Sequence, residues 1–253
     1  METLGFDHLA EGLREQAGAV AAVVEAVPPG TAVPTCPLWT IRELVGHIGQ
    51  AHRWAAGIVR TRTAAAFPDP LVAEPGEPPS WPHWLCDGAA ELIDAVREAG
   101  ASSPLWTPIG ERPAAFWLRR MLAETVVHHA DAALATGKPY EIAADLAEDV
   151  ISEAMDILSA PNATSLRASL AALRGDGQTL RWQPQDLPAG WRITRTPDGF
   201  SWDRSANGAD VTVNGPVRDL MLVFARRLPP TDHRVEVTGD RELLDDWLAA
   251  TAL

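Results

Sequence analysis

The chain has 253 residues, enough for one large domain or two smaller ones with a sizeable hydrophobic core. Its 34 acidic and 21 basic residues give a formal net charge of −13, which disfavours nucleic acid and membranes as partners, because both attract Lys and Arg. No apolar run approaches the ~20 residues that span a bilayer, and the N-terminus lacks a basic segment followed by an apolar one. These features predict a globular protein of the cytoplasm.

Apolar residues recur at helical spacing over the first 158 residues. The start of the second predicted helix is well defined, because Thr40 and Glu43 have the spacing of a capping box. The proline-rich segment 64–83 is predicted to be a long loop outside the core. The predicted helices cover residues 4–27, 39–59, 84–99, 112–137 and 142–158. Four of them are long enough for an antiparallel four-helix bundle.

From about residue 178 the pattern changes to alternating apolar and polar residues between turn-forming sequences, which predicts strands. The predicted strands cover residues 178–184, 190–196, 199–204, 209–215 and 233–240, and two helices follow Pro216 and Asp240. We therefore predict an α+β chain, with a helical domain over residues 1–160 and a smaller α+β domain over residues 161–253.

The two cysteines, Cys36 and Cys86, lie far apart in the sequence. They match neither a CxxC redox pair nor the spacing of a zinc ribbon. We expect both to be buried thiols of a reducing compartment.

The stretch ETVVHHADAALATG, residues 124–137, places acidic and histidine side chains on the fourth helix. Glu124 and His128 project from one side with Asp131 beside them, whereas His129 points elsewhere as a surface or packing residue. Glutamate and histidine bind zinc and similar ions, but a catalytic zinc usually has three protein ligands. His47, on the buried face of the second helix, is the best candidate for the third.

These residues also have an interpretation without a metal. A glutamate and a histidine four residues apart often form a surface ion pair worth a few tenths of a kcal/mol. His47 would then be a hydrogen-bonded core residue. Burying an unpaired imidazole beside a carboxylate is costly, which favours the metal, but the spacing alone leaves both interpretations open.

Several stretches resemble the mycothiol-dependent maleylpyruvate isomerase family. WTIRELVGHIG (39–49) and WLRRMLAETVVHHADA (117–132) are similar to the metal-binding motifs of its N-terminal domain. VNGPVRDLMLVFARRL (213–228) and VTGDRELLDDWL (237–248) are similar to its small C-terminal α+β domain. The resemblance implies that the N-terminal domain is a DinB-like four-helix bundle.

The resemblance also implies roles for individual residues. The divalent metal, expected to be zinc, would be held by His47, Glu124 and His128, and Asp131 would orient His128. Arg120 would hold the glutamate or meet an anionic substrate.

The C-terminal helix departs from the family pattern, because Arg226 and Arg227 stand where its members usually have Gly-Arg. Arg227 is the candidate from this domain for a substrate carboxylate.

The implied activity uses mycothiol as a thiol cosubstrate. The metal would favour the thiolate, which would attack a small electrophile, for example an oxo-acid. Release of the thiolate after bond rotation would give a cis-trans isomerase, and retention would give an S-transferase. Two other classes remain open: a hydrolase that uses metal-bound water, and a non-catalytic protein that binds a small ligand or senses stress.

Overall fold

The computed structural model describes residues 4–252 and, within them, every side chain except that of Leu166. The chain divides into two compact units, Met1–Glu141 and Ile142–Leu253. This division lies before helix α5 (Ala144–Leu158), whereas the sequence predicted a boundary after residue 160. The reason is that α5 packs against α7 (Val217–Phe224) of the second unit. None of the described helices is long and apolar enough to cross a membrane.

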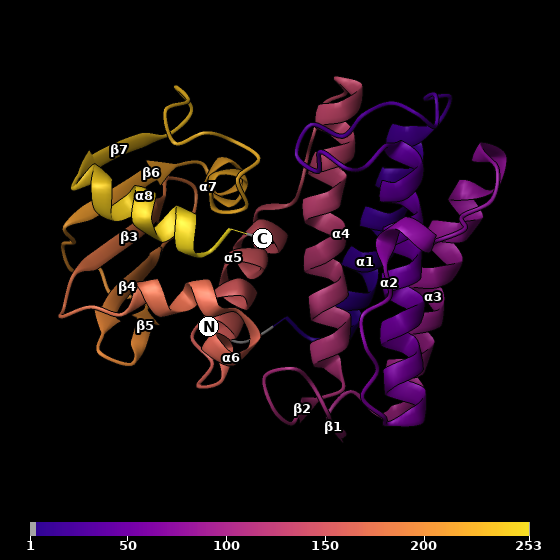
Figure 1. Ribbon diagram of the computed structural model, residues 1–253, viewed down its shortest axis with the longest axis horizontal. Helices are drawn as coiled ribbons and strands as arrows, with labels where there is room; N and C mark the ends of the chain where they lie inside the picture. Colours follow the sequence, from indigo (N-terminus) through magenta and orange to yellow (C-terminus); the bar gives the residue numbers. More distant parts are fainter. Residues whose placement is uncertain (1–3, 253) are drawn as a thin grey trace. The chain divides into compact units, whose positions relative to one another are not determined.

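The first unit is a four-helix bundle, as predicted (Figure 1). Helices α1 and α2 each contact both α3 and α4, and α3 also contacts α4 less extensively. The helices are α1 (Phe6–Val24), α2 (Ile41–Thr61), α3 (Trp81–Ala99) and α4 (Ala115–Thr136). The predicted capping box of Thr40 and Glu43 is present at the start of α2. A short hairpin, β1 (Pro104–Leu105) and β2 (Arg112–Pro113), lies in the connection between α3 and α4.

The contacts of α2 fix its direction relative to its neighbours. Going along α2 from His47 to Trp54, the ring contacts on α4 go backwards from His128 to Trp117, so α2 and α4 are antiparallel. Towards α3 the order is the same on both helices: Val45 accepts a hydrogen bond from Trp84, and Arg60 pairs with Glu91 further along. Helices α2 and α3 are therefore parallel neighbours, which corrects the predicted antiparallel arrangement for this pair.

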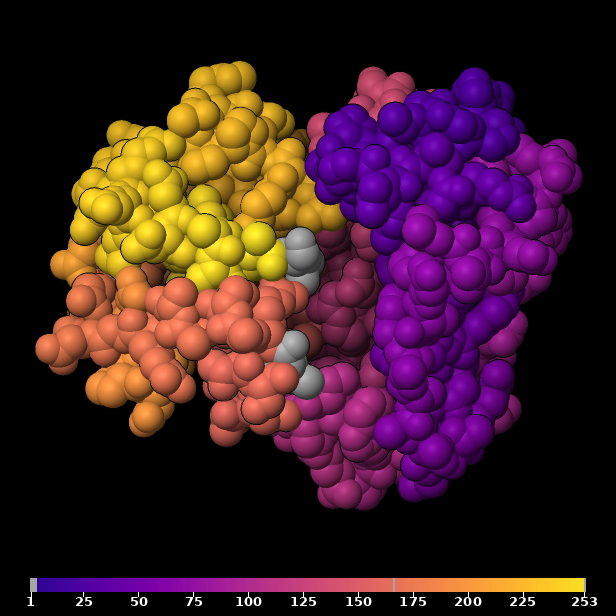
Figure 2. Space-filling view, in the orientation of Figure 1, coloured from indigo at the N-terminus to yellow at the C-terminus, as the bar shows by residue number. Residues whose placement is uncertain are grey.

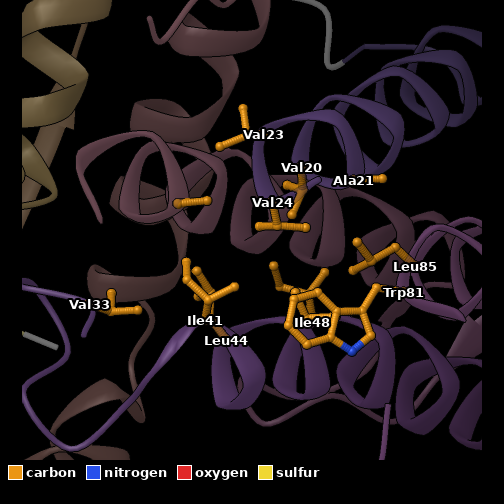
Figure 3. Close-up of a cluster of buried hydrophobic side chains, with 12 residues drawn as sticks. Val20, Ala21, Val23, Val24, Val33, Ile41, Leu44, Ile48, Trp81 and Leu85 are labelled. Atoms are coloured by element: carbon orange, nitrogen blue, oxygen red, sulfur yellow. The ribbon is translucent and has the colours of Figure 1, made fainter. Parts of the chain in front are cut away.

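Parallel neighbours need a connection that returns along the bundle. The proline-rich segment between α2 and α3, residues 62–80, is this crossover, and it contains two short 3-10 helices, η1 (Pro70–Val72) and η2 (Pro78–Ser80). The prediction that residues 64–83 lie outside the core is wrong at its end, where Trp81 begins α3 and is only 1% exposed. Trp81 packs with Ile48 and Leu85 in the core cluster shown in Figure 3.

The two cysteines differ from the prediction that both are buried. Cys36 is partly buried, in the loop between α1 and α2, and Cys86 is exposed on α3. Neither of these two cysteines is part of a disulfide bond in the part of the chain that the structure describes.

The second unit contains a five-stranded sheet of order β5-β4-β3-β6-β7, in which β3 and β6 are parallel and the other pairs antiparallel. The alternating burial of β4 and β6 explains the sequence pattern that predicted the strands. The strands are β3 (Thr179–Pro184), β4 (Trp191–Thr196), β5 (Gly199–Asp203), β6 (Val211–Gly215) and β7 (Glu236–Gly239). Three fully buried tryptophans, Trp182, Trp191 and Trp247, help to fill the interior.

Helices complete this unit. α7 follows β6, as predicted from Pro216, and α8 (Arg241–Ala250) begins at Asp240, whose side chain caps the Leu243 N–H. The remaining elements, α6 (Ala163–Leu166) and η3 (Ala168–Leu173), connect α5 to the sheet. The predicted α+β architecture is confirmed.

The bundle interior also holds a histidine, His52 of α2, which is 1% exposed. Its Nε2 lies 2.8 Å from the hydroxyl of Thr125 on α4. Burial, together with the charge of Arg53, lowers the pKa of His52 to about 3. The imidazole therefore stays neutral in the folded protein at pH values where the unfolded chain, with a pKa near 6.5, binds a proton.

We predict that His52 makes the free energy of unfolding fall as the pH decreases from 7.5 to 5, with a contribution of about 2 kcal/mol. The sign follows because the unfolded state binds more protons below pH 6.5. Urea unfolding of His52→Gln should show a pH dependence that is smaller by this amount, whatever the stability of the variant at pH 7.5. Equal pH dependence in the two proteins would contradict the prediction.

Candidate metal centre

Helices α2 and α4 bring together the three predicted ligands. One donor atom each from His47, Glu124 and His128 lies within 4.8 Å of the others. The two imidazole rings meet edge to face with centroids 4.8 Å apart, and both histidines are buried. The antiparallel contact of α2 with α4 therefore creates a set of nitrogen and oxygen donors of the kind that binds zinc.

Asp131 fixes the orientation of His128. Its Oδ2 lies 2.8 Å from His128 Nδ1, and its Oδ1 accepts a hydrogen bond of 2.5 Å from the hydroxyl of Thr35. Asp131 is fully buried. When Nδ1–H donates to Asp131, the lone pair of Nε2 is left for a metal, on the side where Glu124 Oε2 lies 3.4 Å away.

Glu124 is held by charge on both sides. Arg120, one turn earlier on α4, donates to Glu124 Oε1, and His128 faces Oε2. Burial alone would raise the pKa of Glu124, but the Arg120 charge and the bonds with His128 outweigh it and hold the pKa well below its usual range. For His128, burial lowers the pKa, and the bonds to Asp131 and Glu124 outweigh it and raise the pKa. The carboxylate is therefore ionised and available as a ligand.

His47 fits the role of third ligand. Burial, reinforced by neighbouring His128, lowers the pKa of His47 to about 4, so the ring is neutral near pH 7. Its Nδ1 is buried and has no hydrogen-bond partner among the residues that the structure describes. An unpaired buried ring nitrogen is costly, and a divalent ion bound through Nδ1 would remove that cost. The residues present thus fit a divalent metal.

Aromatic side chains enclose the histidines. The Trp39 ring lies 4.8 Å from His47 and 5.6 Å from His128, and the Phe67 ring lies 5.6 Å from His47 and 4.9 Å from Trp54. The loop 25–40, which carries Trp39, is visible at one end of the bundle in Figures 1 and 2. The sequence pattern does not predict these aromatic residues at the site, because the paths of the loops decide which rings reach it.

A second donor group overlaps with the first. Cys36, His128 and Asp131 form a cluster in which Cys36 Sγ lies 3.9 Å from Asp131 Oδ2. Sequence spacing gave no indication of it, because Cys36 is in the loop before α2. Thr35, which holds Asp131, was missed for the same reason.

The remaining candidates lie elsewhere. His129 is buried rather than on the surface, with Nδ1 3.0 Å from Gln16 Oε1, and it packs the bundle. In the second unit, Arg226 has a left-handed backbone (φ 64°) and donates to the Leu248 carbonyl. Arg227 follows it just after α7 and donates to the Ala225 carbonyl at 2.6 Å. Of the two arginines, Arg226 thus holds the end of α8 in place.

Comparisons with known proteins agree with this architecture. Residues 9–133 match the family described as the mycothiol maleylpyruvate isomerase N-terminal domain, and residues 145–246 match the C-terminal domain of the same family. The second match begins near the start of α5, in agreement with the division between the two units.

Individual proteins are similar as well. A crystal structure of the mycothiol-dependent maleylpyruvate isomerase superposes with a TM-score of 0.61 at 16% identity, covering 94% of this chain and 96% of that chain. A mutant of that enzyme gives a TM-score of 0.60 at 15% identity, with the same coverage. Two uncharacterized proteins of Mycobacterium tuberculosis, strains CDC 1551 / Oshkosh and ATCC 25618 / H37Rv, are each 30% identical over 140 residues, 54% of this chain and 70% of theirs. The two domain matches together show that the chain belongs to the mycothiol-dependent maleylpyruvate isomerase family.

Proposed function

We propose that this protein is an enzyme that uses a divalent metal ion, with zinc expected, to activate the sulfur of mycothiol against a small electrophilic substrate. The observation that carries the proposal is the convergence of His47, Glu124 and His128 on two antiparallel helices of a chain from a mycothiol-dependent family. Three protein ligands leave a coordination position for the thiol.

A bound metal ion would lower the pKa of the thiol, so that the thiol loses its proton well below its free pKa. The protein side chains prepare this site. His47 is neutral near pH 7, and His128, whose pKa is raised, would give up its proton on binding the metal. Glu124 is an ionised ligand whose charge Arg120 balances. Asp131 and Thr35 keep His128 in the tautomer that offers Nε2.

The thiolate sulfur would add to an activated double bond of the substrate. Rotation about the resulting single bond and departure of the thiolate give a cis-trans isomerase, whereas an adduct that is retained gives an S-transferase. If the electrophile is an oxo-acid, Arg227 stays our candidate from the C-terminal domain for binding its carboxylate. The tryptophans that fill the interior of the second unit do not favour a carrier of apolar ligands.

We predict that the protein binds close to one divalent ion per chain and that His47→Ala and His128→Ala lose it. Each substitution removes one of three ligands. Metal content after reconstitution and dialysis, measured by elemental analysis, provides the test. His129→Gln is the matched control, because His129 neighbours His128 in sequence but faces Gln16, and it should keep the ion. If the unmutated protein binds no ion after reconstitution, the result contradicts the proposal.

We further predict that Asp131→Asn weakens metal affinity by about 10- to 100-fold, because the amide holds the ligand tautomer of His128 less strongly. Competition with a chromophoric chelator measures the affinity. Asp94→Asn, an exposed change on α3, should leave it unaltered. Equal affinities of Asp131→Asn and the unmutated protein would show that Asp131 does not support the ligand.

The reaction class follows from a product analysis with metal-loaded protein, maleylpyruvate as the electrophile, and mycothiol present or absent. We expect conversion only with the thiol. If free thiol is recovered unchanged after many turnovers, the enzyme is an isomerase. If one thiol is consumed for each product molecule, it is an S-transferase. Hydrolysis without the thiol would instead support the metal-bound-water mechanism, and metal binding without conversion would support the non-catalytic alternative.

A further inference from the structure

The face of α2 that carries His47 continues with two polar side chains, Gln50 and Trp54. Residues three and seven positions beyond His47 project from the same side of the helix. The carbonyl oxygen of Gln50 and the indole N–H of Trp54 are both buried, and neither has a hydrogen-bond partner among the residues that the structure describes. His47 Nδ1, itself in a side chain only 6% exposed, is the third unpaired atom on this face.

The crossover between α2 and α3 lies along this face. The ring of Phe67 lies between His47 and Trp54, with centroid distances of 5.6 and 4.9 Å, and Phe67 is 47% exposed. Further along the crossover, Ala73 approaches α2 so closely that a Cβ on Gly46 would lie 2.9 Å from the Cβ of Ala73. Gln50 and Trp54 are partly buried beside the candidate metal centre, and Gln50 Oε1 and Trp54 Nε1 themselves are shielded from water.

Buried polar groups are nearly always paired, so an unpaired acceptor and an unpaired donor on adjacent turns indicate a missing ligand. Gln50 Oε1 accepts and Trp54 Nε1 donates, and side chains four residues apart on a helix have Cβ atoms about 5–6 Å apart. A secondary amide offers the complementary pair, a carbonyl oxygen and an N–H. A carboxylate fits less well, because it would place negative oxygen beside the Gln50 oxygen.

We propose that Gln50 and Trp54 bind an amide group of the thiol cosubstrate, so that this protein selects thiols whose sulfur lies a few bonds from an amide. The assignment rests on the proposed function, which places the sulfur on the metal ion that His47 would help to hold. Gln50 is one helical turn beyond His47, a separation that a chain of a few bonds spans. The Trp54 N–H donates to the amide carbonyl, and the Gln50 oxygen accepts from the amide N–H.

The test compares two thiols that differ in one group. N-acetylcysteamine has an amide, and 2-mercaptoethyl acetate has an ester in its place, which keeps the carbonyl but lacks the N–H. Calorimetric titration of the zinc-reconstituted protein should show about tenfold tighter binding of the amide, since one hydrogen bond to a buried acceptor is lost with the ester.

Variants separate the two contacts. Gln50→Met should bind both thiols with equal affinity, because it lacks the acceptor, whereas Gln50→Glu keeps an acceptor and should keep the preference. Trp54→Phe retains the ring that contacts Phe67 and Trp117, and it should weaken both thiols about equally while the preference remains. Trp106→Phe, a change of an exposed tryptophan, is the control, and measured zinc content verifies that each variant keeps its metal centre.

Two results would overturn the assignment, and they are distinguishable. If the unmutated protein binds both thiols with equal affinity, Gln50 and Trp54 do not recognise an amide, although thiol binding at the metal is still supported. If neither thiol binds the zinc-loaded protein, the proposed function fails and the assignment fails with it.

Discussion

The antiparallel contact of α2 with α4 is the interaction on which the rest of the site depends. It places His47 against His128 at one level of the bundle and Trp54 against Trp117 at another. Between these levels His52 reaches Thr125, so the contact is polar as well as apolar. A shift of either helix by one turn, about 5.4 Å, would separate the donor atoms, because they now lie within 4.8 Å of one another.

The parallel contact of α2 with α3 constrains the surroundings of the site. The helices approach closely where Gly49 faces Trp84, and a Cβ on Gly49 would lie 2.2 Å from the indole nitrogen. Because parallel neighbours cannot be joined by a tight turn, the crossover must return along the bundle. That return brings Phe67 onto His47, so a topological requirement of the fold also supplies a wall of the site.

Local patterns account for the parts that the sequence predicted well. Helical spacing predicted that Glu124, His128 and Asp131 lie on one face of the fourth helix. His47 was identified as the third ligand because it lies on the face of the second helix that was predicted to be buried. The residues that escaped prediction, such as Phe67 and Thr35, come from loops whose paths are set by long-range packing. The domain boundary was misplaced for a related reason, since periodicity identifies α5 as a helix but does not tell which unit it packs against.

Charge balance links the polar network to the proposed chemistry. His47 and His128, as neutral ligands, would add no charge to a bound divalent ion, and Glu124 would add one negative charge that Arg120 partly neutralises. Asp131 is a second negative charge behind His128, and its oxygens are engaged by His128, Thr35 and Cys36. With Arg120 included, the two carboxylates would still not neutralise a divalent ion. The site therefore leaves a divalent ion with net positive charge, which favours an anionic sulfur over a neutral thiol as its next ligand.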